Sequence, residues 1–423
     1  MANLLHHLPA DVLLHVFTYL PAADKFNVRV CCKYFDQLVS HRSLWEDYTA
    51  CFSFKNGRYN PLFWTSLARR GLKRAVVLGG LKEKHWIQLA STLPSLSTLV
   101  VDNGIQECAR HLNKFPKLRS LALRGNNTRN AFAVIKCLTV VDPELMTCIS
   151  LCNVDFLSPE HFLAFLSQFP NLTSLEYHSA GDIRNQVQMF HCIISGLPKL
   201  KHFSWAMNHY SKYVSVPEKG LGETADCFSN QTLTSLELVV YDDSCLSNDT
   251  MRSLTRLQSL TVVYMDSQEG HRLKTWLSHV PQLSTLVIKG GPPSREYGGS
   301  IPAKVTSLTM CVNQLTSADL AVIASKVQGL LHLHLEPWPS DCHTGLIFKL
   351  FPNLQSIKLR IWQIGEKNFL DLHRFRSMQR IEVMDAADSP RIAEISRQLQ
   401  TLNDKIRILT SSGPRDPCAC YHH

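Results

Sequence analysis

The sequence lacks several features that define common classes of protein. None of its hydrophobic stretches reaches 18 uninterrupted apolar residues, so neither a membrane-spanning helix nor a membrane partner is expected. The N-terminus lacks the basic flank, short apolar core and small-residue cleavage site of a secretory signal. The 14 cysteines are scattered without the spacing of a disulfide framework, which is typical of thiols in a reducing compartment. We therefore expect a protein of the cytoplasm, the nucleus or both.

Recognisable catalytic patterns are also missing. No Ser/His/Asp grouping, paired-carboxylate motif, phosphate-binding glycine loop or Cys/His dyad occurs at an interpretable spacing, so we expect no enzyme activity and no cofactor. The tail "CACYHH" has metal-ligating residue types, but Cys418, Cys420, His422 and His423 are spaced too tightly to reach one zinc ion together. Cys420 is fourth from the end, yet the two residues after it fit a prenylation box poorly. We expect no metal site, and a flexible tail over 414–423.

Positive charge is concentrated in one short region. The formal net charge is +9, and residues 51–90 hold eight basic residues and one acidic residue, with a cluster "RRGLKR" at 69–74. No recognisable nucleic-acid module accompanies this cluster. We interpret it as a solvated basic connector and expect no nucleic-acid partner.

A short leucine-rich phrase recurs along most of the chain, at intervals of about 22 to 33 residues and mostly near 25, within the range of leucine-rich repeats. The phrase places alternate side chains, such as Leu121 and Leu123, on one side of a short strand. Between copies the apolar spacing becomes helical, as in "SPEHFLAFLSQFP" at 158–170. Strong copies lie at 93–102, 115–124, 169–178, 197–206, 231–240, 254–263, 280–289, 302–311, 327–336 and 351–360, and weaker copies at 71–80, 144–153, 376–385 and 404–413.

One such unit cannot bury its own apolar face, so the units are expected to stack. The pattern resembles a leucine-rich repeat solenoid, a curved α/β fold of parallel strands and helices, which we assign to residues 76–413. Two stretches depart from the period and are candidate partner-binding loops. These are the insertion at 210–230 and the glycine- and proline-rich segment 290–299, which we expect to be flexible.

The first fifty residues follow a different pattern. The segment "LPADVLLHVFTYLP" at 8–21 is expected to form a helix whose only polar stripe consists of Asp11, His15 and Thr18. Two further short helices are expected before Leu44 and Trp45. Three helices in about 45 residues bury too little surface to be stable alone, so a covering partner is expected.

This segment resembles an F-box. The resemblance rests on Leu8–Pro9, the apolar positions of 12–21, Asp24, Cys31–Cys32–Lys33, Phe35 and Leu44–Trp45, with departures at Lys25 and Cys31, where other residue types are usual. It implies a non-catalytic substrate receptor of an SCF-type ubiquitin ligase, in which a Skp-type adaptor binds residues 1–50 and links them to cullin and RING subunits. The adaptor-binding residues that it implies are Leu8, Pro9, Val12, Leu13, Val16, Phe17, Leu20, Cys31, Leu44 and Trp45. Two alternatives stay open. Residues 8–21 could pack on the chain's own first repeats, or the chain could be a cytosolic scaffold or sensor with no ligase role.

A helical connector is expected over 51–75. In "NPLFWTSLARRG", Asn60 precedes Pro61 at the expected start of a helix, and Gly71 stands at its expected end. The apolar residues Leu62, Phe63 and Leu67 indicate a rigid joint between the two modules.

A protein client, whose identity the sequence does not indicate, is expected on the concave face. There the residues between the inward leucines point away from the core. Toward the C-terminal end, Lys358, Arg360 and Arg380 form a basic strip that suits an acidic or phosphorylated segment, although a merely solvated strand face is the alternative. The candidate client-binding residues are Arg124, His178, Lys289, His334, Lys358 and Arg360.

Overall fold

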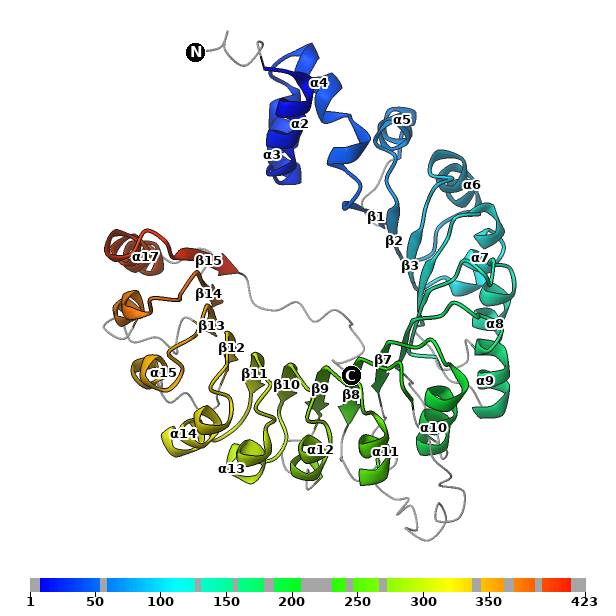
Figure 1. Cartoon of the computed structure of the whole chain (residues 1–423). Coiled ribbons are helices and arrows are strands. Elements are labelled where there is room, and N and C mark those ends of the chain that lie inside the picture. The colour runs from blue at the N-terminus through cyan, green and yellow to red at the C-terminus, as the bar shows by residue number, and fades with distance from the viewer. Residues whose placement is uncertain are drawn as a thin grey trace. The chain divides into compact units, whose positions relative to one another are not determined.

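The computed structural model (Figure 1) describes eleven stretches of the chain: residues 8–53, 59–125, 131–154, 159–178, 186–206, 230–240, 246–265, 272–336, 344–360, 369–384 and 390–411. These stretches fall into two compact units. Unit 1 contains Met1–Phe156 and Gln168–Leu172, and unit 2 contains Leu157–Ser167 and Thr173–His423.

Unit 1 begins with short helices and continues as alternating strands and helices. Strands β1 to β5 pair in parallel, each with the next along the chain. Its elements are α2 (Ala10–Thr18), α3 (Ala22–Arg29), α4 (Lys33–Val39), η1 (Arg42–Leu44), β1 (Thr49–Ser53), α5 (Pro61–Arg70), β2 (Arg74–Leu78), α6 (Glu83–Thr92), β3 (Thr98–Asp102), α7 (Ile105–Ala109), η2 (Leu112–Lys114), β4 (Ser120–Arg124), α8 (Ala131–Thr139) and β5 (Cys148–Cys152).

Unit 2 repeats the strand and helix alternation. Strands β6 to β15 again pair in parallel with their neighbours in chain order. Its elements are α9 (Pro159–Leu166), β6 (Ser174–His178), α10 (Gln186–Gly196), β7 (His202–Ala206), β8 (Ser235–Val240), α11 (Asn248–Ser253), β9 (Ser259–Tyr264), α12 (Leu273–His279), β10 (Thr285–Lys289), α13 (Ser294–Tyr297), η6 (Gly298–Ser300), β11 (Ser307–Cys311), α14 (Ser317–Lys326), β12 (His332–Leu335), α15 (Thr344–Leu350), β13 (Ser356–Arg360), η8 (Asp371–Arg374), β14 (Arg380–Met384), α17 (Pro390–Leu402) and β15 (Arg407–Ser411).

All fourteen predicted copies of the leucine-rich phrase contain a strand, β2 to β15, which confirms the predicted repeat fold. Leu121 and Leu123 of β4 are buried as predicted, and strict alternation is seen in β10, where Leu286 and Ile288 are the buried residues. In unit 2, Figure 1 shows β7 to β15 along the inner side of an arc and the helices along its outer side. The core lies between these layers, where Phe162 and Leu166 of α9 are fully buried.

The sheet of unit 1 starts earlier than predicted. Strand β1 pairs in register with β2, so residues assigned to the connector are already part of the repeat fold. The helix between these strands, α5, is capped as predicted. The Asn60 side chain accepts a hydrogen bond from the Phe63 amide at 2.8 Å, and Gly71 ends the helix at φ +60°. Its apolar face differs from the prediction, because Leu67 is buried whereas Leu62 is 78% exposed.

The expected flexible loop at 290–299 is instead ordered structure. Its second half forms α13 and enters η6, with Tyr297 and Ser294 fully buried. Burial of the large Tyr297 ring favours this order, because removing apolar surface from water stabilises the fold. The predicted insertion at 210–230, apart from Asn230, and the predicted tail at 414–423 lie outside the described residues. Within the described part of the chain, no helix is long and apolar enough to cross a membrane.

Candidate functional sites

The first candidate site is the outer face of the N-terminal helices. On α2, Leu13 and Phe17 are four residues apart and point inward, where the Phe17 ring meets the Phe35 ring edge-on at 5.5 Å between centroids. Leu44 and Trp45 are also buried, and the Trp45 indole donates a hydrogen bond to the Val39 carbonyl at 2.5 Å. These four predicted adaptor-binding residues are therefore corrected to core residues of the helical bundle.

Another side of the same segment is apolar and exposed. Leu8, Val12 and Val16 recur every four residues and are 38%, 41% and 47% exposed. We call these three residues the α2 face. Among the other predicted adaptor-binding residues, Pro9 and Cys31 are exposed and Leu20 is half-buried. Burial of Leu13 and Phe17 against the chain's own helices does not cover the α2 face.

Two buried cations, Lys25 and Arg70, contact aromatic rings in the N-terminal part of unit 1, and the Lys25 ammonium lies 4.5 Å from the centroid of the Tyr48 ring. The ammonium of Lys25 is buried and donates to the Leu44 carbonyl and the Tyr48 hydroxyl, both at 3.1 Å. The guanidinium of Arg70, from α5, lies 4.2 Å above the centroid of the Trp45 ring. Such cation–π contacts stabilise a fold by about 0.5–2 kcal/mol each.

These contacts change two predictions from the sequence. Lys25, a departure from the F-box pattern, is part of the packing of the helices. Arg70, assigned to a solvated basic connector, is also buried. Nearby, the ammonium of Lys73 lies 2.9 Å from the carboxylate of Glu46, so the helical bundle is joined to the start of the repeats by several contacts within unit 1.

The second candidate site is the concave face of β11 to β14 in unit 2. The register places Thr309, His334, Lys358 and Glu382 side by side on successive strands. Between these strands the surface forms a groove of about 190 Å³, whose polar lining also includes hydroxyl groups of Ser307 and Ser356. Parallel strands in register thus bring together residues that are one repeat apart in the sequence.

The predicted basic strip on this face is paired with carboxylates. The Lys358 ammonium lies 2.8 Å from one oxygen of Glu382, and the Arg380 guanidinium lies 2.9 Å from the other. Arg360 forms an ion pair with Glu336. The strip is therefore largely neutralised, and the site presents a mixed polar surface instead of the basic surface expected from the sequence.

A thiol, an imidazole and a carboxylate meet beside the groove. The ligating atoms of Cys311, His334 and Glu336 all lie within 4.8 Å of one another. Nε2 of His334 is 2.7 Å from Oε1 of Glu336, and Arg360 donates to Oε2 of the same carboxylate. Burial alone would raise the pKa of Glu336, but the hydrogen bonds from His334 and Arg360 outweigh it and lower the pKa to about 2. Burial, together with the charge of Glu336, raises the pKa of the Cys311 thiol to about 12.

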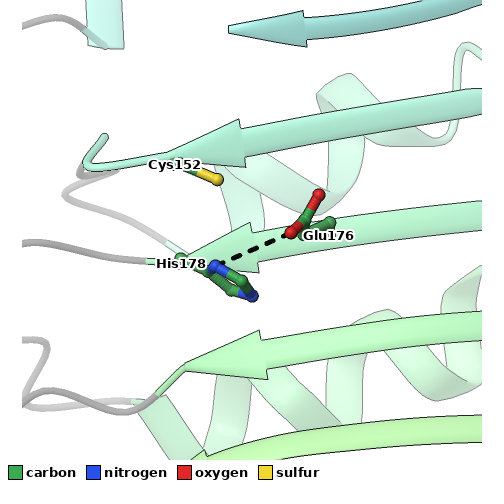
Figure 2. Close-up of side chains that lie close together, drawn as sticks. All are labelled: Cys152, Glu176 and His178. Atoms are coloured by element: carbon green, nitrogen blue, oxygen red, sulfur yellow. Dashed lines mark ion pairs between the residues drawn. The ribbon is translucent and has the colours of Figure 1, made fainter. Parts of the chain in front are cut away.

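The remaining predicted client-binding residues do not join this group. His178 is only 1% exposed, so its assignment to client contact is corrected. Figure 2 shows its imidazole beside Glu176, with 3.8 Å between Nδ1 and the carboxylate. Lys289 is half-buried at the end of β10, and Arg124 is half-buried at the end of β4 in unit 1.

The surroundings of His178 do not form a nucleophile and base pair. Ser204 donates its hydroxyl proton to Glu237 at 2.8 Å, because a carboxylate at this contact accepts. Nε2 of His178, 2.9 Å from the Ser204 oxygen, must then donate to it and cannot act as its general base. The three side chains form a hydrogen-bonded row across β6, β7 and β8.

Sequence reasoning missed the roles of Cys311, Glu336 and Glu382. The sequence pattern singles out neither this cysteine among the scattered cysteines nor the two glutamates. A comparison of equivalent positions in successive repeats could have found them, since Arg360 and its partner Glu336 are 24 residues apart, about one repeat.

Comparisons with known proteins bear on both regions. Residues 5–50 match the F-box-like family model. A search of curated proteins found no match. Solved structures similar to the chain include the leucine-rich repeat-containing protein LegL7 from Legionella pneumophila, with 17% identity, 69% of this chain and 94% of LegL7 covered, and a TM-score of 0.44. The complex of Rad7 and Elc1 in yeast gives 16% identity, 85% and 86% coverage, and a TM-score of 0.45. The functional domain of InlJ from Listeria monocytogenes gives 12% identity, 72% and 62% coverage, and a TM-score of 0.29.

Proposed function

We propose that this chain, an F-box-like protein with a leucine-rich repeat fold, is the substrate-recognition subunit of an SCF-type ubiquitin ligase in the cytoplasm or the nucleus. The F-box-like segment implies a Skp-type partner. Through that partner the chain would join cullin and RING subunits. In this role the chain is a non-catalytic adaptor, with one surface for the Skp-type protein and another for a client.

The observation that carries this proposal is the exposed α2 face within the F-box-like segment. Leu8, Val12 and Val16 form an apolar row that the chain's own helices leave uncovered. Burying apolar surface contributes about 25 cal/mol per Å², so a partner groove that covers this row gains several kcal/mol. A helix laid in a groove is a common mode of protein recognition, and its contacts recur at this spacing.

The client surface in this proposal is the groove between β11 and β14. Its lining offers hydroxyl groups, imidazoles and paired charges in one concave place. Such a surface fits a polar segment of a client protein, with specificity from complementary hydrogen bonds.

A matched pair of variants tests the adaptor surface. Val16 and Val322 are both 47% exposed valines in helices, but Val322 lies on α14 of unit 2. We expect Val16→Glu to weaken binding of the full chain to a Skp-type adaptor by about a hundredfold, because a carboxylate would be buried in an apolar interface. Val322→Glu should leave the affinity unchanged. Equal binding by both variants would contradict the proposal, as would no binding by the unmodified chain.

A second pair tests the client surface in cells with the proteasome blocked. Thr309→Arg fills the groove, whereas Thr261→Arg changes a residue at the equivalent register position on β9, outside the groove lining. We expect proteins that are captured by the unmodified chain to be lost with Thr309→Arg and kept with Thr261→Arg. The same proteins should still bind Val16→Glu but escape ubiquitination. If the captured proteins were still ubiquitinated with the Val16→Glu variant, their ubiquitination would not depend on the adaptor surface. The chain would then be a scaffold without a ligase role.

A further inference from the structure

We propose that Cys311, His334 and Glu336 form a zinc-binding site on the concave face of unit 2. The three side chains supply a thiol sulfur, an imidazole nitrogen and a carboxylate oxygen, all within 4.8 Å of one another. The thiol and the imidazole beside this one carboxylate favour Zn²⁺ over Mg²⁺ or Ca²⁺, which prefer oxygen ligands alone.

The spacing of the donors fits a tetrahedral ion after small side-chain rotations. Zinc bonds of about 2.0–2.3 Å place neighbouring ligand atoms about 3–4 Å apart. Cys311 ends β11, and His334 and Glu336 lie on and just after the adjacent β12, so the backbone that carries them is fixed by the strand pairing. Glu336 is tied to that strand pair by a hydrogen bond from its amide to the Met310 carbonyl at 2.8 Å.

The carboxylate of Glu336 is already oriented for this role. Arg360 donates to Oε2, which leaves Oε1 facing Nε2 of His334 at 2.7 Å. An ion between these two atoms replaces their mutual hydrogen bond, while Arg360 keeps its hold on the other oxygen. A hydrogen bond of this kind to a ligating carboxylate is a common support for metal sites.

Binding also changes the protonation of the thiol. The Cys311 sulfur would form its bond to zinc as a thiolate and release one proton to solvent, while the imidazole binds in its neutral form. Three protein ligands leave the fourth position of a tetrahedral ion open to water or to a group of a bound molecule. His334 lines the groove as well, so the proposed zinc site lies beside the candidate client surface.

The test measures Zn²⁺ binding to the full chain after chelator treatment, by competition with a chromophoric chelator. We expect one Zn²⁺ per chain at this site, and at least a tenfold loss of affinity in Cys311→Ser and in Glu336→Gln. Cys148→Ser is the matched control, because Cys148 is also a half-buried free cysteine in a strand. It should leave the affinity unchanged. Binding that is equal in Cys311→Ser and the unmodified chain would overturn the proposal, as would no binding at all.

Two further measurements distinguish the proposed site from the C-terminal tail and test cysteine ligation without a variant. The C-terminal tail also has Cys418, Cys420, His422 and His423, so a chain ending at residue 413 is titrated in parallel. Zinc retained by this shortened chain supports the proposed site, and zinc lost with the tail contradicts it. Should the Cys311 variant fail to fold, Co²⁺ bound to the unmodified chain reports directly. A sulfur-to-cobalt charge-transfer band in the shortened chain supports cysteine ligation, and its absence overturns it.

Discussion

The N-terminal helices and the concave face of β11 to β14 place their cationic side chains in different environments. In the N-terminal part of unit 1, the cations of Lys25 and Arg70 are buried against aromatic rings, and the α2 face is apolar and exposed. On the concave face, Lys358 and Arg360 are paired with carboxylates and remain partly exposed. Under the proposed function, this difference implies that the adaptor is bound through buried apolar area and the client through exchange of polar partners.

The largest expected effect separates the core of α2 from its outer face. Phe17→Ala should destabilise unit 1 by about 3–5 kcal/mol, because it removes a buried ring that contacts Phe35. Val12→Ala, on the exposed side, should change stability by less than about 1 kcal/mol. Urea unfolding of the two variants measures the contrast. Similar losses from both would mean that the chain itself covers the α2 face.

A smaller effect is expected at Glu336 and depends on pH. In the metal-free chain, Glu336→Gln should cost about 1–3 kcal/mol at neutral pH, because His334 and Arg360 lose a charged partner. The pKa of Glu336 is lowered from 4.5 to about 2, so its contribution is complete above about pH 4.5 and declines as the pH falls toward 2. Unfolding curves between pH 7 and pH 3 measure the gap between variant and unmodified chain, which should narrow with acid. A constant gap would rule out the charge of Glu336 as its source.

Removing the buried cation of Arg70 should have a modest effect on the stability of unit 1. Arg70→Met keeps an apolar stem but removes the guanidinium above Trp45 and is expected to cost about 0.5–2 kcal/mol. The matched control is Arg69→Met on the same helix, where the side chain is exposed and the expected change is within about 0.5 kcal/mol. Thermal unfolding measures the difference in stability between the Arg70→Met and Arg69→Met variants. If the two variants were equally stable, this would argue against a role for Arg70 in joining the helical bundle to the first repeats of unit 1.

The smallest expected effect is the response of the concave ion pairs to salt. Lys358→Met should destabilise unit 2 by less than about 1 kcal/mol in low salt, because partly exposed pairs contribute little. The difference should shrink further near 1 M salt, where screening acts over about 3 Å. The affinity for the adaptor, which is bound through the apolar α2 face, should be nearly insensitive to the same increase in salt. If this affinity and the stability difference caused by Lys358→Met responded equally to salt, the two surfaces would not differ as described.

Periodicity was enough to predict the repeat fold, because each copy of the phrase needs the next to bury its leucines. It missed β1, whose residues "TACFS" carry no leucine phrase, although this strand pairs with β2 in register. It could not divide α2 into core and surface either. In a helix that is apolar on most sides, spacing alone does not decide that Leu13 is buried and Val12 exposed.

The candidate site on the concave face was only partly predictable. The outward positions of Lys358 and Arg360 followed from strand alternation. Their neutralisation did not, because Glu336 and Glu382 lie one repeat before or after them in sequence and meet them only through the register of parallel strands. Contacts of this kind depend on how neighbouring repeats align. The intervals between copies of the leucine-rich phrase are irregular, so the sequence alone does not fix that alignment.

Oxidative footprinting of the full chain, alone and with a Skp-type adaptor, tests whether the adaptor covers the α2 face. Mass spectrometry would follow oxidation of Leu8, Val12 and Val16, with the exposed Leu62 and Val322 as internal references. We expect the adaptor to protect the α2 face severalfold while both references react at unchanged rates. Unchanged oxidation of the α2 face in a chain saturated with adaptor would contradict it.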